Sequence, residues 1–345
     1  MADDTDQPSD RLRDRAGESR WKLWLLLEAD RRVVVAGSAL AVFGVLLAAG
    51  TLYGPTAHAL RSTDSVDTTF QGFLTATITG VTLVLTLNQL VLSQELGAVG
   101  DQRERMDEAM AFRSDAADLL DAPVSPARPA QFLRALVQVS ADCAREVREA
   151  ADRAGDDEAA AAVDDLVSSL IGNAEEVSEG LDDARFGGFD VISSALNFNY
   201  SWKVFAANRI RATHGDALEG EGLEALDRLT DVLEMFGPAR EHFKTLYFQW
   251  ELINLSRAVL ASALPALLVS TFMVAFFHAE AYAVTLFGVG TLVPLVAAAA
   301  TVATVPFLVL LAYVLRIATV TKHTLSIGPF ILRETDEVSE VEWNR

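Results

Sequence analysis

The chain has 345 residues, of which 51% are hydrophobic, and its 48 acidic and 28 basic side chains give a formal net charge of −20. The apolar residues are concentrated in a few long runs, which excludes a single ordinary soluble domain. The single cysteine, Cys143, excludes an internal disulfide framework and any metal centre built from several cysteines. The acidic balance argues against nucleic acid as a partner, because phosphate contacts require a basic face. It is typical of salt-loving microbes, and a GC-rich genome that favours arginine, alanine and aspartate is the alternative explanation.

Two apolar runs in the first hundred residues are long enough to cross a membrane. The run 33–53 contains no charge, and at 1.5 Å per residue it extends about 30 Å, the thickness of the hydrocarbon core. A signal peptide is the competing interpretation, but the run is too long and roughly thirty mixed residues precede it. The second run, 70–92, contains Gln71, Asn88 and Gln89 but no ionised side chain. We therefore expect a transmembrane span at each run.

The second span is expected to continue without a break into the cytoplasm as one long helix. No proline interrupts residues 93–113, and the pattern remains helical despite Gly97 and Gly100. Pro123 is the first residue that would end this helix.

The middle region, 100–250, is predicted to form a helical domain on the cytoplasmic side. Apolar residues recur there at helical spacing, and no stretch alternates convincingly with period two. The recurring residues are Phe132, Leu133, Leu136 and Val137; Val163, Leu166, Val167, Leu170 and Ile171; and Leu223, Leu226, Leu229, Leu233 and Phe236. Gly187 and Gly188 are expected to break the chain, and Gly237 with Pro238 is expected to end a helix. A domain of about 130–150 residues can enclose its own core.

Two further apolar runs, 258–278 and 291–315, predict a third and a fourth span separated by a short loop. Basic residues flank the four runs mainly on one side, and the two connecting loops contain only Arg61. The flanking residues are Lys22, Arg31, Arg32, Arg103, Arg105, Arg113, Lys244, Arg257, Arg316, Lys322 and Arg333. By the positive-inside rule, both termini and the middle domain face the cytoplasm.

The predicted fold is therefore an all-α, multi-pass plasma-membrane protein with four transmembrane helices and a cytoplasmic helical domain. Its expected parts are a disordered or amphipathic N-terminus (1–30), a first transmembrane hairpin (31–99), the helical domain (100–250), a second hairpin (251–318) and a cytoplasmic tail (319–345).

One face of the second span carries a repeating series of polar side chains at alternating intervals of four and three residues. Its members are Thr75, Thr79, Thr82, Thr86, Gln89 and Ser93. The opposite face holds Phe73, Val84, Leu87 and Val91. Because an unsatisfied polar group is costly in lipid, we expect this stripe to face protein or water.

Two interpretations of the stripe remain open. As a pore lining, the same face continued by helical steps reaches Gly100 and then Arg103, which would set the charge at the cytoplasmic mouth. As a packing surface, the hydroxyls bond their own helix or a neighbouring one, which is the more common use of small polar residues in membranes.

The fourth span contains Pro294 and Pro306 on either side of the small residues 297–300. Prolines bend helices, so the two residues are candidate hinges, and tight helix packing is the alternative. Pro265 in the third span has the same two interpretations.

No motif in the chain predicts an enzyme, a cofactor or a metal site. The five histidines show no ligand spacing, and no phosphate-binding loop, nucleophile elbow or dinucleotide fingerprint is present. His278 and Glu280 lie at the outer edge of the third span, where they could bind a cation, although such a pair is more often an interfacial polar cap.

The order of these parts resembles the bestrophin-like architecture: two spans, a long second helix that enters the cytoplasm, a helical domain and two more spans. The matching spans are 33–53, 70–92, 258–278 and 291–315. The resemblance implies a homo-oligomer, a pentamer in that family, whose second spans surround a central anion pore. The family's neck is lined by bulky apolar side chains, whereas this helix presents threonines, so ion selectivity does not follow from the resemblance.

These patterns favour an oligomeric ion channel whose partners are the lipid bilayer, other copies of the chain and inorganic ions. The alternative is a non-conducting membrane sensor or scaffold whose acidic helical domain binds a cytoplasmic partner. A secondary transporter is the weakest hypothesis, because the chain lacks internal repeats.

Overall fold

The computed structural model describes residues 24–53, 56–62, 64–182, 184, 189–218, 220–279, 285–286 and 289–323. The expectations for the N-terminus up to residue 23, for Gly187, Gly188 and Glu280, and for the tail beyond residue 323 lie outside these residues. The described residues divide into two compact units. The "helical unit" is built on residues 97–248, and the "apolar unit" comprises the described residues of 21–96 and 249–320.

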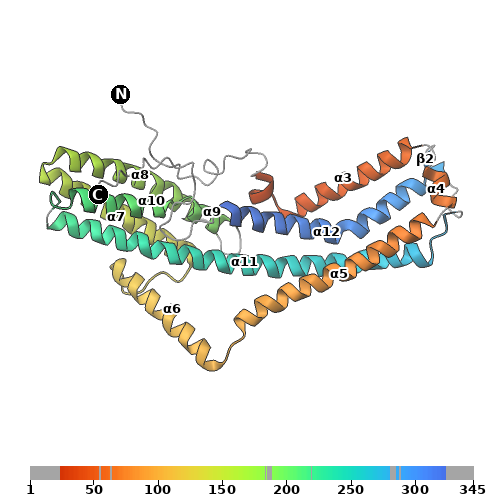
Figure 1. Cartoon of the computed structure of the whole chain (residues 1–345), viewed down its shortest axis with the longest axis horizontal. Coiled ribbons are helices and arrows are strands. Elements are labelled where there is room, and N and C mark those ends of the chain that lie inside the picture. Colours follow the sequence, from red (N-terminus) through yellow and green to blue (C-terminus); the bar gives the residue numbers. More distant parts are fainter. Residues whose placement is uncertain are drawn as a thin grey trace, which may run out of the picture. The chain divides into compact units, whose positions relative to one another are not determined.

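The apolar unit contains long helices with short connections (Figure 1). In chain order its elements are the π-helical turn η1 (Trp24–Glu28), α3 (Arg31–Leu52), α4 (Thr56–Ser62), α5 (Ser65–Glu95), the second part of α11 (Glu221–Ala275), the paired strands β1 (Thr285–Leu286) and β2 (Val289–Gly290), and α12 (Leu292–His323). Four helices, α3, α5, α11 and α12, are long and apolar enough to cross a membrane. For the residues that the structure describes, the predictions of an all-helical fold and of four span-length helices are confirmed, apart from the antiparallel pairing of two-residue strands.

The core of the apolar unit is formed by α5, α11 and α12. One cluster packs Phe70 of α5 against Met273 of α11 and Ala303 of α12. A second cluster joins Val84 to Leu255 and Val309. None of the 22 residues of α3 is buried, so this helix lies at the edge of the unit. Ala299 and Ala300 of α12 belong to the first cluster, and side chains of this size permit close helix approach.

The prediction that the second span continues unbroken was wrong. Helix α5 ends at Glu95, and α6 (Val99–Leu119) begins after an interruption in which Leu96 and Ala98 have extended backbone. Glycine costs about 1 kcal/mol relative to alanine in a helix interior. Residues 96–100 are all exposed, so no burial compensates for Gly97.

The uninterrupted helix is instead α11, where Gly237 and Pro238 were expected to end a helix. Residues 236, 237, 239 and 240 are buried, so packing opposes a break. The Cβ of the residue before a proline normally clashes with the proline ring in helical conformation. Gly237 has no Cβ, which removes that clash and lets the helix pass through Pro238.

The helical unit contains α6, α7 (Pro129–Ala154), α8 (Asp157–Asp182), α9 (Asp190–Leu196), α10 (Tyr200–His214) and the first part of α11. Helices α7 and α8 form a hairpin in which Gly155 adopts a left-handed conformation (φ 74°). Asp156 Oδ1 accepts hydrogen bonds from the amides of Glu158 and Ala159, at 3.0 Å each, and so caps α8. The apolar stripes predicted on α7 and α8 form the core: Leu133, Leu136, Val137, Val163, Val167 and Leu170 are each 0% exposed.

Helix α6 packs on the helical unit only through its C-terminal half. Every residue from 101 to 110 is exposed, whereas Ala116 and Ala117 are buried. Met106 and Met110 are 62% and 57% exposed. The first half of α6 therefore presents surface that the described part of its own chain does not cover.

The single cysteine reports on the folding of the helical unit. Cys143 is 1% exposed on α7, and burial raises the pKa of its thiol to about 11, a shift that the charge of Arg228 partly opposes. Maleimide labelling requires the exposed thiolate. We expect negligible labelling of the native protein at pH 8 and rapid labelling once the unit unfolds in urea. Fast native labelling at pH 8 would show that α7 opens without global unfolding.

Candidate functional site

The hydroxyl stripe of α5 lies on the surface of the apolar unit. Thr75, Thr79, Thr82, Thr86, Gln89 and Ser93 are all exposed. Each threonine hydroxyl donates to a carbonyl one turn earlier on the same helix: Thr75 to Gln71 (3.1 Å), Thr79 to Thr75 (2.8 Å), Thr82 to Ile78 (3.0 Å) and Thr86 to Thr82 (3.0 Å). Ser93 donates to Leu90 at 2.7 Å. The hydroxyl hydrogens are thus satisfied within the helix, and the oxygen lone pairs remain available on the outer face.

The opposite face of α5 packs on the apolar unit. Phe70, Thr77 and Val84 are 0%, 1% and 1% exposed, and they lie at helical spacing on this inner face. The stripe therefore does not serve packing among the described helices of its own chain. Its outer face is left uncovered by the described residues.

Arg103 does not continue the stripe as predicted. It lies on α6, beyond the interruption at residues 96–98, and the two helices belong to different units. Its side chain is 83% exposed and lies 3.7 Å from Asp107, one turn further along α6. The extension from Ser93 to Arg103 assumed one helical register, which the break removes.

A charged cluster in the apolar unit joins the first, third and fourth candidate spans. Arg31 Nη2 donates to Glu251 Oε1 at 2.8 Å, and Arg316 Nη1 lies 3.9 Å from the same oxygen. The three side chains are only 9–12% exposed. The guanidinium of Arg31 also lies over the ring of Tyr313, 5.5 Å from its centroid. Charges in or beside membrane helices that are this well buried and paired mark functional or assembly sites.

A polar contact also ties α5 to α11. The hydroxyl of Ser256 lies 2.7 Å from Asn88 Oδ1 and 2.9 Å from the Leu252 carbonyl. Asn88 therefore faces the inside of the apolar unit, whereas its neighbour Gln89 is exposed with the stripe.

The two candidate hinges have different positions in α12. Pro294 lies in the first turn, where an amide has no partner within the helix, so it is tolerated there. Pro306 is buried in the helix interior, where its missing N–H leaves a carbonyl without a helical hydrogen bond. Figure 1 draws α12 as a bent helix, so a bend is built into the fourth candidate span.

His278 lies at the end of the third candidate span, just after α11. His278 is exposed, and its Nδ1 lies 3.2 Å from the Phe276 carbonyl. Among the residues that the structure describes, no group of three or more histidine, cysteine, aspartate or glutamate side chains could hold a metal ion.

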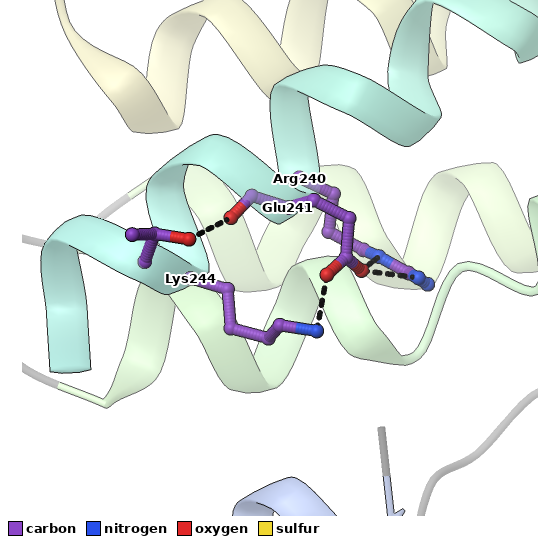
Figure 2. Close-up of polar contacts among 4 residues, drawn as sticks. Arg240, Glu241 and Lys244 are labelled. Carbon is purple, nitrogen blue, oxygen red and sulfur yellow. Dashed lines mark hydrogen bonds and ion pairs between the residues drawn. The ribbon is translucent and has the colours of Figure 1, made fainter. Parts of the chain in front are cut away.

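The helical unit has its own charged group on α11. Figure 2 shows the carboxylate of Glu241 between Arg240 and Lys244. Arg240 donates to Glu241 Oε1 at 2.8 Å, and its guanidinium lies 4.8 Å from the centroid of the Tyr200 ring. Arg240 is thus held from two directions, with a side chain only 5% exposed.

The described residues of the helical unit line a larger and a smaller cavity. The larger, of about 550 Å³, lies among α6, the segment 126–127, α7 and α11. The smaller, of about 360 Å³, lies between α7 and α8 and is lined by two acidic residues and Arg145. Arg145 already pairs with Asp142 there.

Comparison with known proteins places the chain in a family. The profile of a family of unknown function, DUF7972, matches residues 1–345. The chain belongs to this family. No curated protein and no solved structure matches it. The bestrophin-like resemblance therefore stays a prediction from the order of the spans.

Sequence reasoning identified the stripe but missed the cluster around Glu251. It used Arg31 and Arg316 only as markers of membrane orientation. The available signal was Glu251 itself, an acidic residue at the start of an apolar segment that contains one other charge, Arg257, before residue 276. An acid in that position needs a basic partner, and the nearby span ends supply the candidates.

Proposed function

We propose that this protein assembles as a homo-oligomer in the membrane and conducts ions along the hydroxyl stripe of α5. The observation that carries the proposal is the outward position of the stripe. Six polar side chains at alternating intervals of four and three residues lie away from the core that α5 forms with α11 and α12. A face of this kind meets protein or water at lower cost than lipid, since its outer oxygens can still accept hydrogen bonds.

The proposed orientation places both termini and the helical unit in the cytoplasm, and the proposed location is the plasma membrane. The supporting pattern is the distribution of lysine and arginine, because the two connecting loops contain only Arg61. In this orientation the charged cluster lies at the cytoplasmic ends of three spans. The pentameric state is proposed from the bestrophin-like resemblance alone.

The hydroxyl geometry favours cations over the anions that this resemblance implied. Each threonine of the stripe has donated its hydrogen to its own backbone and presents lone pairs outward. Oxygen acceptors replace the hydration shell of a cation, whereas an anion requires donors. The reversal potential in asymmetric KCl separates the two cases.

The decisive test replaces stripe residues and measures conductance in planar bilayers. Thr82→Leu and Thr86→Leu put apolar bulk into the proposed path and are expected to lower single-channel conductance by about tenfold or more, as hydrophobic constrictions do. Thr82→Val keeps the shape and removes only the hydroxyl, so it is expected to reduce conductance less and to weaken ion selection.

The matched control is Thr51→Val on α3, another exposed threonine whose hydroxyl bonds its own helix, to the Leu47 carbonyl at 2.8 Å. It should leave conductance unchanged. The particle mass in detergent tests the assembly separately. A strict monomer without current, or currents that all stripe variants leave unaltered, would overturn the proposal.

A non-conducting sensor or scaffold is the second candidate, and the exposed half of α6 is the observation that favours it. Met106 and Met110 present flexible apolar side chains with no cover from the described part of the chain. A photo-crosslinking residue at position 106 separates the candidates. Crosslinks between copies of this chain support oligomer assembly, whereas crosslinks to a different protein support the scaffold.

A further inference from the structure

The larger cavity of the helical unit has an aromatic wall. Phe112 of α6, Phe132 of α7 and Phe243 of α11 line it, and their rings form a chain with centroid separations of 6.1 Å for Phe112–Phe132 and 6.1 Å for Phe132–Phe243. Pro126 and Pro238 add apolar surface. The volume of about 550 Å³ is within the range of about 300–1,000 Å³ that is typical of small-molecule sites.

The lining is basic although the chain is strongly acidic. Arg105 and Arg113 line the cavity beside His242 with a single acid, Glu108, whereas the whole chain has 48 acidic residues against 28 lysines and arginines. The smaller cavity shows the ordinary balance of this chain, with Asp142 and Glu175 against Arg145. The lining of the aromatic cavity is therefore more basic than that of the smaller cavity.

Arg113 is the residue that points to a ligand. It is half-buried, and its Nη2 donates to the Ser125 carbonyl at 2.8 Å. No carboxylate in the described part of the chain pairs with it, and this one bond uses only one of its five N–H donors. A half-buried guanidinium beside aromatic rings gains most from an anionic partner, because charge-assisted bonds strengthen as water is excluded.

Ser125, whose carbonyl accepts the hydrogen bond from Arg113, has a side-chain hydroxyl without a partner among the described residues. Ser125 is 3% exposed, and its hydroxyl finds no hydrogen bond among the described residues. Ser125 directly precedes Pro126 of the lining. A buried hydroxyl without a partner costs about 1–3 kcal/mol. The loop at Ser125, which accepts the hydrogen bond from Arg113, therefore has an unused hydrogen-bonding group beside the cavity.

We propose that this cavity binds an anionic amphiphile, with its head group on Arg113 and its apolar part against Phe112, Phe132 and Phe243. The shared chemistry is a carboxylate or phosphate attached to an acyl chain. A free long-chain carboxylate and an anionic membrane lipid both have this chemistry. Binding at this site would make the helical unit a receptor for such molecules, independently of whether α5 conducts ions.

The test uses the purified full-length protein in nanodiscs of zwitterionic phosphatidylcholine. The probe is 11-(dansylamino)undecanoic acid, and its uncharged methyl ester is the comparison, both followed by dansyl fluorescence. The acid is expected to bind about tenfold more tightly than the ester, which cannot form the charge-assisted bond. Arg113→Gln should lower the affinity for the acid by about tenfold and leave the affinity for the ester unchanged.

A second variant fills the cavity without touching the core. Ala109 is exposed on α6 and lines the cavity, so Ala109→Trp should abolish binding of both probes. The matched controls are Ala111→Trp on the same helix and Arg209→Gln on α10, two exposed positions outside the lining, and both should bind as the wild type does. Unchanged Cys143 protection confirms that each variant is folded.

The two sources are separated by adding anionic phosphatidylglycerol to the nanodiscs. If the lipid lowers the apparent affinity of the probe, the natural ligand is an anionic lipid. If it has no effect while free oleate displaces the probe, the ligand is a free carboxylate. Equal binding of the acid and the ester, or wild-type binding by both Arg113→Gln and Ala109→Trp, would overturn the proposal.

Discussion

Replacing Glu251 with glutamine is expected to destabilise the protein by about 3 kcal/mol, because the change leaves two buried guanidinium groups without their shared anion. Glu251 Oε1 lies 2.8 Å from Arg31 and 3.9 Å from Arg316, and the side chains are only 9–12% exposed. Glutamine has the same shape as glutamate and can still accept a hydrogen bond, so the loss of stability reports the contribution of the negative charge alone. Unfolding in increasing fractions of sodium dodecyl sulfate, followed by circular dichroism, measures it.

The matched control is Glu221→Gln on the same helix. Glu221 pairs with Arg153 at 2.9 Å, but the two side chains are 81% and 64% exposed, so water screens the pair and the expected change is below about 1 kcal/mol. Adding Arg316→Gln to Glu251→Gln removes one of the two cations that contact Glu251 Oε1 and should recover part of the lost stability. If Glu251→Gln is as mild as Glu221→Gln, the cluster does not hold the spans together.

The four span-length apolar helices among the described residues could be predicted because their signal is local. The length and apolar composition of a run such as 33–53 can be read from one stretch of sequence. The helix that forms there makes all its backbone hydrogen bonds within the same stretch. The apolar stripes of α7 and α8 were predictable for a related reason, since 3.6-residue periodicity records which face is buried.

Helix boundaries were less predictable because they depend on packing that one sequence does not display. Gly97 and Gly237 carry the same intrinsic penalty, and Pro238 adds to it at the second position. The chain breaks at Gly97, where the flanking residues are exposed, and continues through Gly237, where Phe236 and Ala239 are each 1% exposed. Burial, which is a property of the folded unit, decided between them.

In the candidate site, too, local features could be predicted from the sequence and contacts between distant residues could not. Periodicity predicted which residues share the outer face of α5, but the continuation to Arg103 failed with the helix break. The pair of Arg31 with Glu251 joins residues 220 positions apart, and no local pattern specifies such a partner. The cavity beside Phe112 and Phe243 likewise exists only after α6 and α11 have met.

Gly237→Ala is expected to lower the stability of the helical unit by about 2 kcal/mol, the typical cost of overpacking. An added Cβ would lie 2.8 Å from Tyr200 Cε2 and 3.0 Å from its Cζ and hydroxyl oxygen. The ring cannot retreat easily, because Tyr200 is 5% exposed and its ring lies between Phe236 and Arg240, at centroid distances of 5.9 and 4.8 Å. The same Cβ would also restore the clash with the ring of Pro238. The urea midpoint of Cys143 labelling measures the change.

Gly172→Ala is a control in which the same substitution is expected to raise, not lower, the stability of the helical unit. Gly172 lies in the interior of α8, is exposed, and has no atom of the described residues within 4 Å of an added Cβ. Alanine there improves helix propensity by about 0.5–1 kcal/mol, so the labelling midpoint should rise. A rise for both variants would mean that Tyr200 moves aside at little cost. It would also mean that the missing Cβ before Pro238 is not what allows α11 to continue, and that burial of residues 236, 239 and 240 suffices.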